Sequence, residues 1–128
     1  MNEQQFKQRT KQLALRVIRM VELLPRGQTP DVIGRQILRS ATSVGANYRA
    51  ACRARSIEAM IAKLDIVLEE ADETLYWLEL LVEADVVPEA RLTALMHETD
   101  EITAMIVASL KTLHAKSMEA PRRVRSGY

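Results

Sequence analysis

Apolar residues recur every three or four positions along most of this chain, which is the spacing of one face of an α-helix. The clearest run lies in the middle of the chain, where the apolar positions are Ile57, Ile61, Leu64, Leu68, Ala71, Leu75, Leu78 and Val82. Similar stripes mark residues 5–24, 30–53 and 88–116. The pattern therefore predicts four amphipathic helices, the third of which has an apolar seam typical of packed helices.

Short breaks with turn and capping residues separate the four segments. The first break, "LPRGQTPD", contains Gly27, which can close a helix, and Thr29, which can cap the next one. Pro30 suits a first helical turn, as does Pro88 after the break "EADVVPEA". Ser56 is the predicted cap of the third helix.

We predict one all-α domain, an antiparallel up-down-up-down four-helix bundle over residues 1–116, followed by a flexible basic C-terminal tail over residues 117–128. Four long helices joined by short links favour this topology. Gly and Pro, the main turn residues, number only four each, and aromatic residues make up 4%. Both values are low for an all-β protein. Because no apolar run is long enough for a signal peptide or a membrane span, we expect a cytoplasmic protein.

Charge is segregated along the chain, although the net charge is only +1. Residues 1–57 carry eleven Lys/Arg and three Asp/Glu, whereas residues 58–110 carry two Lys/Arg and thirteen Asp/Glu. Residues 111–128 carry five Lys/Arg and one Asp/Glu. Such asymmetry indicates either a nucleic-acid partner or helices of opposite charge that attract each other.

The arginines of the first two predicted helices are the candidates for nucleic-acid binding. Helical spacing lines up those of the second helix on one side, and the planar guanidinium group suits phosphate oxygens. The alternative is that they pair with the acidic stripe of the third helix, within or between subunits. Arg39 lies between apolar rows, and we expect it to form a pair of this kind that is buried or lies at a subunit interface. The candidate phosphate-binding residues are Arg9, Arg16, Arg19, Arg35, Arg49, Arg53 and Arg55.

Several other residues are candidates for packing or for a subunit interface. The small residues of "SATSVGANYRAA", Gly45 among them, predict a close approach of helices. Asn47 would then need hydrogen-bond partners, for which an acidic side chain of the third helix or a backbone carbonyl is a candidate. Tyr76 and Trp77 suit a subunit interface, although Trp77 suits the core equally well. The structural or interface set is Arg39, Ser43, Asn47, Glu73, Tyr76 and Trp77.

The sequence predicts no catalytic residue, metal ligand or cofactor. The two histidines, His97 and His114, do not follow an acid by three residues, as they would in the Glu-x-x-His motifs of di-iron bundles. The chain has no strained Gly-x-Ser-x-Gly turn and no glycine-rich phosphate loop. Its single cysteine, Cys52, permits no intrachain disulfide and lies on an apolar stripe, where a packed thiol is expected.

Two segments resemble the bacterial 23S rRNA intervening-sequence proteins, also called S23-type proteins. They are "LPRGQTPDVIGRQILRSATSVGANYRAA" and "EEADETLYWLELL", and the resemblance extends over about residues 6–114. Its most specific part is the second helix, with Gln36, Leu38, Arg39, Ser40, Ala41, Ser43, Val44 and Asn47. Family members usually have isoleucine-proline where this chain has Val44-Gly45.

The resemblance implies a four-helix bundle that assembles as a ring-like homo-oligomer, typically a pentamer, and whose function is poorly defined. It also suggests an association with RNA. We therefore expect a non-enzymatic accessory or scaffold protein that binds RNA or DNA through its arginine-rich face. A pure protein–protein interaction module without nucleic-acid binding is the alternative.

Overall fold

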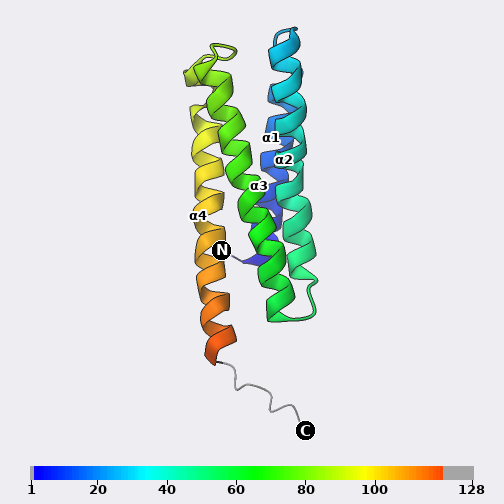
Figure 1. Cartoon of the computed structure of the whole chain (residues 1–128), viewed down its shortest axis with the longest axis vertical. Helices are drawn as coiled ribbons and strands as arrows, with labels where there is room; N and C mark the ends of the chain where they lie inside the picture. The colour runs from blue at the N-terminus through cyan, green and yellow to red at the C-terminus, as the bar shows by residue number, and fades with distance from the viewer. Residues whose placement is uncertain (1, 120–128) are drawn as a thin grey trace.

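The computed structural model describes residues 2–119, and these residues form four helices. The helices are α1 (Glu3–Glu22), α2 (Gln28–Cys52), α3 (Ile57–Glu83) and α4 (Glu89–Glu119). Figure 1 shows successive helices running in alternate directions. The described residues contain no strand, so the predicted all-α class is confirmed.

Contacts between α1 and α2 show the same antiparallel order. Gly34, early in α2, faces Val21 near the end of α1 and Leu24 just beyond it. Gly45, later in α2, faces Thr10 in the first half of α1. The helices follow one another around the bundle, with α1 against α2, α2 against α3 and α3 against α4, whereas α1 and α4 meet over a much smaller area.

The sequence predicted the N-terminal cap of α3 correctly, but not that of α2. Ser56 caps α3, because its hydroxyl accepts a hydrogen bond from the backbone N–H of Ala59 at 3.0 Å. The prediction that Thr29 caps the second helix is wrong, since Gly27 is the cap residue of α2 and has a φ of 147°. Such a φ suits glycine, and the carbonyl of Gly27 accepts the first helical hydrogen bond from Asp31 at 3.0 Å.

The last helix is longer than the sequence pattern predicted. α4 continues to Glu119, past the predicted boundary at residue 116, and the rest of the predicted tail lies outside the described residues. No helix within residues 2–119 is both long and apolar enough to cross a membrane.

The core lies along the axis of the bundle and differs from the predicted seam in one respect. In α3 the buried face is Leu64, Val67, Ala71, Thr74, Leu78 and Leu81. Five of the eight predicted seam residues, including Leu68 and Leu75, are only partly buried. Because α3 packs against both α2 and α4, its apolar arc is wide, and adjacent apolar positions share the burial.

Candidate nucleic-acid interface

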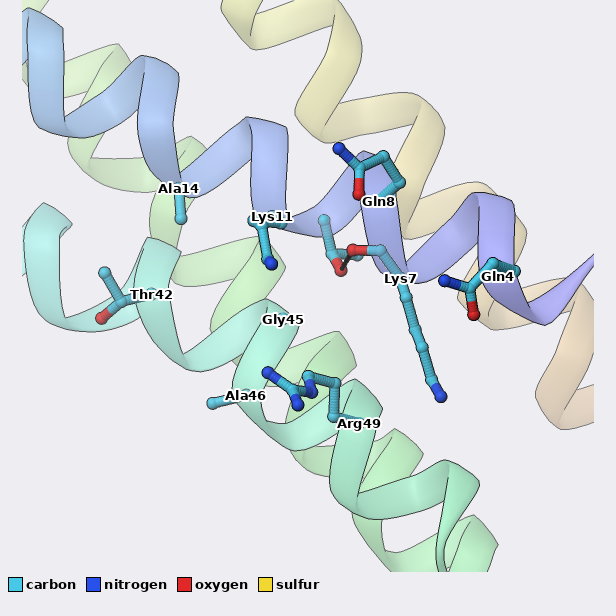
Figure 2. A pocket seen from close by; sticks show the side chains of 10 residues that line it. Gln4, Lys7, Gln8, Lys11, Ala14, Thr42, Gly45, Ala46 and Arg49 are labelled. Carbon is cyan, nitrogen blue, oxygen red and sulfur yellow. Dashed lines mark hydrogen bonds between the residues drawn. The ribbon is translucent and has the colours of Figure 1, made fainter.

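A basic groove lies between α1 and α2. Figure 2 shows Lys7 and Lys11 of α1 and Arg49 of α2 extending along and into this space. The groove encloses about 390 Å³ and is lined by Gln4, Lys7, Gln8, Thr10, Lys11, Ala14, Thr42, Gly45, Ala46 and Arg49. Its lining has three cationic side chains and no carboxylate, so it favours an anion over a cation.

Small residues let the two helices approach at the floor of the groove. A Cβ atom on Gly45 would lie 3.3 Å from the hydroxyl oxygen of Thr10, which is tighter than an ordinary contact. That hydroxyl is fixed, because it donates a hydrogen bond to the carbonyl of Lys7 at 3.0 Å. Ala14 and Ala46 add little bulk to the walls, so the long cationic side chains dominate the lining.

The groove belongs to a longer basic face along α2. Arg35 and Arg53 share the side of the helix that carries Arg49, because positions spaced by fourteen and four residues return to the same side. All three side chains are exposed. Arg19 is exposed on α1, and Arg55 is exposed in the link between α2 and α3.

Within residues 2–119, Arg19, Arg35, Arg49, Arg53 and Arg55 form no ion pair. The same holds for Lys11, which sequence reasoning missed. Lys7 was missed as well, and it has only an exposed pair with Glu3, at 3.8 Å. Lys7, Lys11 and Ala14 are spaced by four and three residues, and this spacing predicts that they lie on one face of α1.

Arg9 is a structural residue in this bundle rather than part of the groove. Its guanidinium group donates two hydrogen bonds to Glu98 of α4, both at 2.7 Å, and another to Glu101. The hydrogen bond with Glu98 is the main reason that the pKa of Arg9 is raised, and the hydrogen bond from Arg9 lowers the pKa of Glu101. Arg16 lies seven residues further along, on the same side of α1, and is half-buried.

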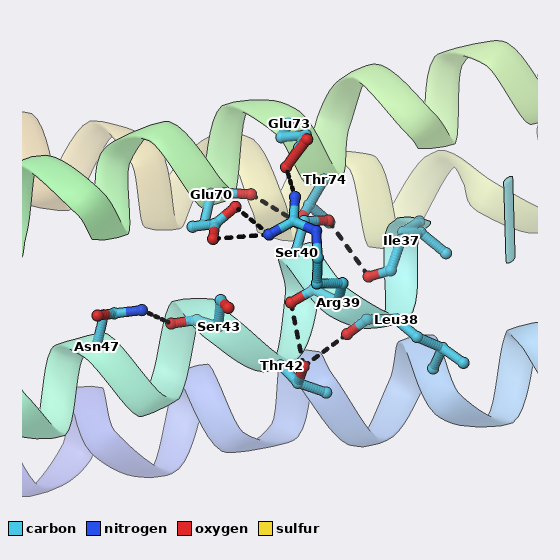
Figure 3. Close-up of polar contacts among 10 residues, drawn as sticks. All are labelled: Ile37, Leu38, Arg39, Ser40, Thr42, Ser43, Asn47, Glu70, Glu73 and Thr74. Atoms are coloured by element: carbon cyan, nitrogen blue, oxygen red, sulfur yellow. Dashed lines mark hydrogen bonds and ion pairs between the residues drawn. The ribbon is translucent and has the colours of Figure 1, made fainter. Parts of the chain in front are cut away.

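Arg39 pairs with the acidic helix α3 of the same chain. Figure 3 shows its guanidinium group between Glu70 and Glu73. The distance to Glu70 is 3.0 Å, and this hydrogen bond is the main cause of the raised pKa of Arg39. The side chain of Arg39 is 50% exposed, so the pair lies at the surface and not in the core.

The hydrogen bond of Asn47 is made within α2. The amide of Asn47 donates to the backbone carbonyl of Ser43 at 2.9 Å, so neither Glu70 nor Glu73 serves as its acceptor (Figure 3). Asn47 and Ser43 are both half-buried.

An acidic surface with two aromatic residues lies along α3. Glu69, Glu70, Asp72, Glu73, Tyr76 and Trp77 line a shallow pocket of about 490 Å³. Tyr76 is 51% exposed, and its ring lies edge-on to that of Trp77 with centroids 5.1 Å apart. Trp77 is half-buried against the core. Among the described residues, no group of three or more His, Cys, Asp or Glu could hold a metal ion.

Comparison with known proteins gives one family. The model of the 23S rRNA-intervening sequence protein family matches residues 2–108. Among solved structures, a protein of unknown function from the S23 ribosomal protein family of Bacteroides thetaiotaomicron superposes with a TM-score of 0.80 and 35% sequence identity. The alignment covers 87% of this chain and 99% of that chain. A search of curated proteins found no match.

Proposed function

The chain belongs to the 23S rRNA-intervening sequence protein family, and we propose that it is a non-enzymatic accessory protein that binds the phosphate backbone of RNA or DNA. The proposal includes assembly into a homo-oligomer, which the family resemblance implies to be a ring of five. Each copy would present the basic face of α1 and α2 to the nucleic acid.

One observation carries the proposal: within residues 2–119 most cations of the basic face have no carboxylate partner, although the chain is rich in acids. The acids that contact arginines pair with Arg9, through Glu98 and Glu101 of α4, and with Arg39, through Glu70 and Glu73 of α3. Arg35, Arg49 and Arg53 have no carboxylate partner within residues 2–119. A row of unneutralised guanidinium groups attracts a polyanion and suits phosphate oxygens.

Self-association is supported by the α3 surface. An exposed aromatic ring on an acidic surface, such as that of Tyr76, is typical of an interface residue. This surface lies on a different helix from the basic groove, so assembly through α3 leaves the groove accessible. Repetition of the basic face around a ring would strengthen binding to a long polyanion through avidity.

The test is the binding of labelled RNA and duplex DNA, followed by fluorescence anisotropy at low and near-physiological salt. We expect affinity to fall steeply with salt, with little dependence on sequence, because phosphate contacts release counterions. Arg49→Glu with Arg53→Glu should abolish binding while the circular dichroism spectrum stays helical. The matched control is Lys63→Glu with Arg91→Glu, which changes the charge equally at exposed positions on α3 and α4.

Two outcomes contradict the proposal. If the Arg49/Arg53 double variant binds as the wild type does, the basic face is not the binding surface. If the control loses as much affinity as the double variant, only net charge matters and the face has no special role.

The second candidate function is a protein-interaction module without nucleic-acid binding. The observation that favours it is the presence of opposite charges on α2 and α3, which could meet between neighbouring copies. In that case high salt should dissociate the oligomer, and no nucleic acid should bind even at low salt.

A further inference from the structure

Three cationic side chains from two helices surround one concave part of the basic face. Lys11 approaches from α1 and Arg49 from α2, with Lys7 beside them (Figure 2). The amide side chains of Gln4 and Gln8 add neutral donors at the α1 wall. The residues outside the groove, such as Arg35, offer charge but lie along an open helix surface.

The chemistry of the lining fits an anion with several acceptor oxygens. It has no carboxylate to repel an anion and no aromatic ring on which a base could stack. Lys7 contacts Glu3 at 3.8 Å, but this exposed i, i+4 pair is weak. Lys11 and Arg49 form no ion pair within residues 2–119, so no carboxylate competes with an anion for their charge.

The shape of the groove distinguishes it from a diffuse basic surface. Its floor is Gly45, and its depth depends on the small side chains of Ala14 and Ala46. The Thr10 hydroxyl at the floor already donates to the carbonyl of Lys7, so the cationic and amide groups are the available donors. A bulky side chain at position 46 would fill the groove without changing any charge.

We infer that this groove is a phosphate-binding site in which Lys11, Arg49 and Lys7 hold one phosphate group of a nucleic-acid backbone. The inference rests on the proposed function, because it names the place on the basic face where a backbone phosphate is held. The same chemistry would bind free inorganic phosphate, so the experiment has a separate arm for each source.

The decisive variant is Ala46→Leu, since position 46 is exposed and leucine is a strong helix former. Its matched control is Ala94→Leu, at an exposed alanine on α4 far from the groove in sequence and on another helix. Lys11→Gln with Arg49→Gln removes charge, and Lys63→Gln with Arg91→Gln is the control for that change.

For labelled RNA and duplex DNA, we expect Ala46→Leu to weaken binding about tenfold and to reduce the salt slope by about 1, as the loss of one phosphate contact does. The charge-removing pair should also reduce the slope by about 1, because its two cations share one phosphate. Both controls should bind as the wild type does. If nucleic acid binds and Ala46→Leu has the affinity and salt slope of the wild type, the groove does not hold a backbone phosphate, while the proposed function stands.

The second arm titrates inorganic phosphate into the wild-type protein and Ala46→Leu, and follows the backbone amide signals by NMR. If nucleic acid does not bind at low salt, the proposed function fails. Phosphate-dependent shifts at Gly45 and its neighbours that disappear in Ala46→Leu would then identify free phosphate as the ligand. If neither nucleic acid nor inorganic phosphate binds, so that the wild-type amide signals do not shift, the groove is not a phosphate-binding site.

Discussion

Arg9 illustrates how one side chain can join two helices that otherwise touch little. It connects α1 to Glu98 and Glu101 of α4, and its guanidinium group lies 3.2 Å from the sulfur of Met105. The side chains of Arg9 and Glu98 are 23% and 19% exposed. The hydrogen bonds are therefore partly shielded from water, where charged hydrogen bonds contribute more than at an open surface.

We expect Arg9→Met to lower the free energy of unfolding by about 1 kcal/mol, which is the usual net value of such an interaction. Arg9→Lys should recover part of the loss, because it keeps the charge but not the planar donor pair. The measurement is urea denaturation followed by circular dichroism. Arg19→Met, at an exposed position without an ion pair in residues 2–119, is the control. Equal stabilities of the two Met variants would show that Arg9 does not hold α1 to α4.

A buried hydroxyl pair joins α2 to α3 in a comparable way. The oxygens of Ser40 and Thr74 lie 2.9 Å apart, both residues are fully buried, and the Thr74 oxygen lies 2.8 Å from the carbonyl of Glu70 (Figure 3). Thr74→Val should cost about 1 kcal/mol, because it leaves the Ser40 hydroxyl with fewer partners. In a double-mutant cycle with Ser40→Ala, the two losses should not add. Additive losses would mean that the two hydroxyls do not interact.

At the scale of helix pairs, the two glycines of α2 that face α1 predict different responses to alanine. A Cβ on Gly34 would meet side-chain methyl groups of Val21 and Leu24 at 3.3 and 3.4 Å, and these methyl groups make no hydrogen bond that would hold them in place. A Cβ on Gly45 would meet Thr10 at 3.3 Å, whose hydroxyl is hydrogen-bonded in place. Alanine gains about 1 kcal/mol of helix propensity at either site.

Gly34→Ala should therefore be neutral or stabilising, whereas Gly45→Ala should be less stable than Gly34→Ala, because strain against Thr10 offsets the helix propensity. Thermal denaturation of the two variants side by side measures the difference. If Gly45→Ala were the more stable of the two, α1 and α2 would not be in tight contact at Thr10.

The contact between α1 and α4 also predicts a response to acid. The pKa of Glu101 is lowered in the folded protein, first by the hydrogen bond from Arg9. A carboxylate with a depressed folded pKa stabilises the fold above its ordinary pKa of 4.5, and this stability is lost as the pH falls through the folded value. We expect the free energy of unfolding to decline below about pH 4.5, and to decline less in Glu101→Gln. Parallel pH profiles of the two proteins would contradict this account.

Helices were easier to predict from the sequence than the contacts between them. The apolar period gave four helices and the Ser56 cap, because both depend on nearby residues. It placed Leu68 in the core where the structure buries Val67, since adjacent apolar residues are ambiguous without knowledge of the neighbouring helix. The start of α2 was misplaced because Gly27 acts through its backbone conformation and not through a capping side chain.

At the scale of the whole molecule, the segregation of charge along the sequence becomes a segregation of surfaces. The basic groove lies between α1 and α2, and the acidic surface lies on α3. The sequence identified the arginine side of α2 and set Arg39 apart as a paired residue, but it grouped Arg9, which pairs within the chain, with Arg49, which does not. That distinction depends on which helix faces each arginine, and no pattern within one helix contains it.

These separate surfaces predict that assembly and nucleic-acid binding respond differently to salt. At 1 M salt the Debye length is about 3 Å, so contacts with phosphates should be lost. Assembly through the α3 surface around Tyr76 should persist, because burial of an aromatic ring is not screened by salt. Sedimentation velocity at low and high salt measures the oligomer, and anisotropy of labelled RNA measures binding under the same conditions.

The variant that separates the two surfaces is Tyr76→Ser, which removes a ring that is 51% exposed and should leave the fold intact. We expect it to dissociate the oligomer and to weaken RNA binding through lost avidity, while the salt slope per copy stays unchanged. Leu23→Ser, at a position that is 76% exposed but lies outside α3, should affect neither property. If instead high salt dissociates the wild-type oligomer and Tyr76→Ser stays assembled, the subunits are held together by their charged faces. The arginines of α2 would then contact a neighbouring copy, and RNA would have to compete with that copy for them.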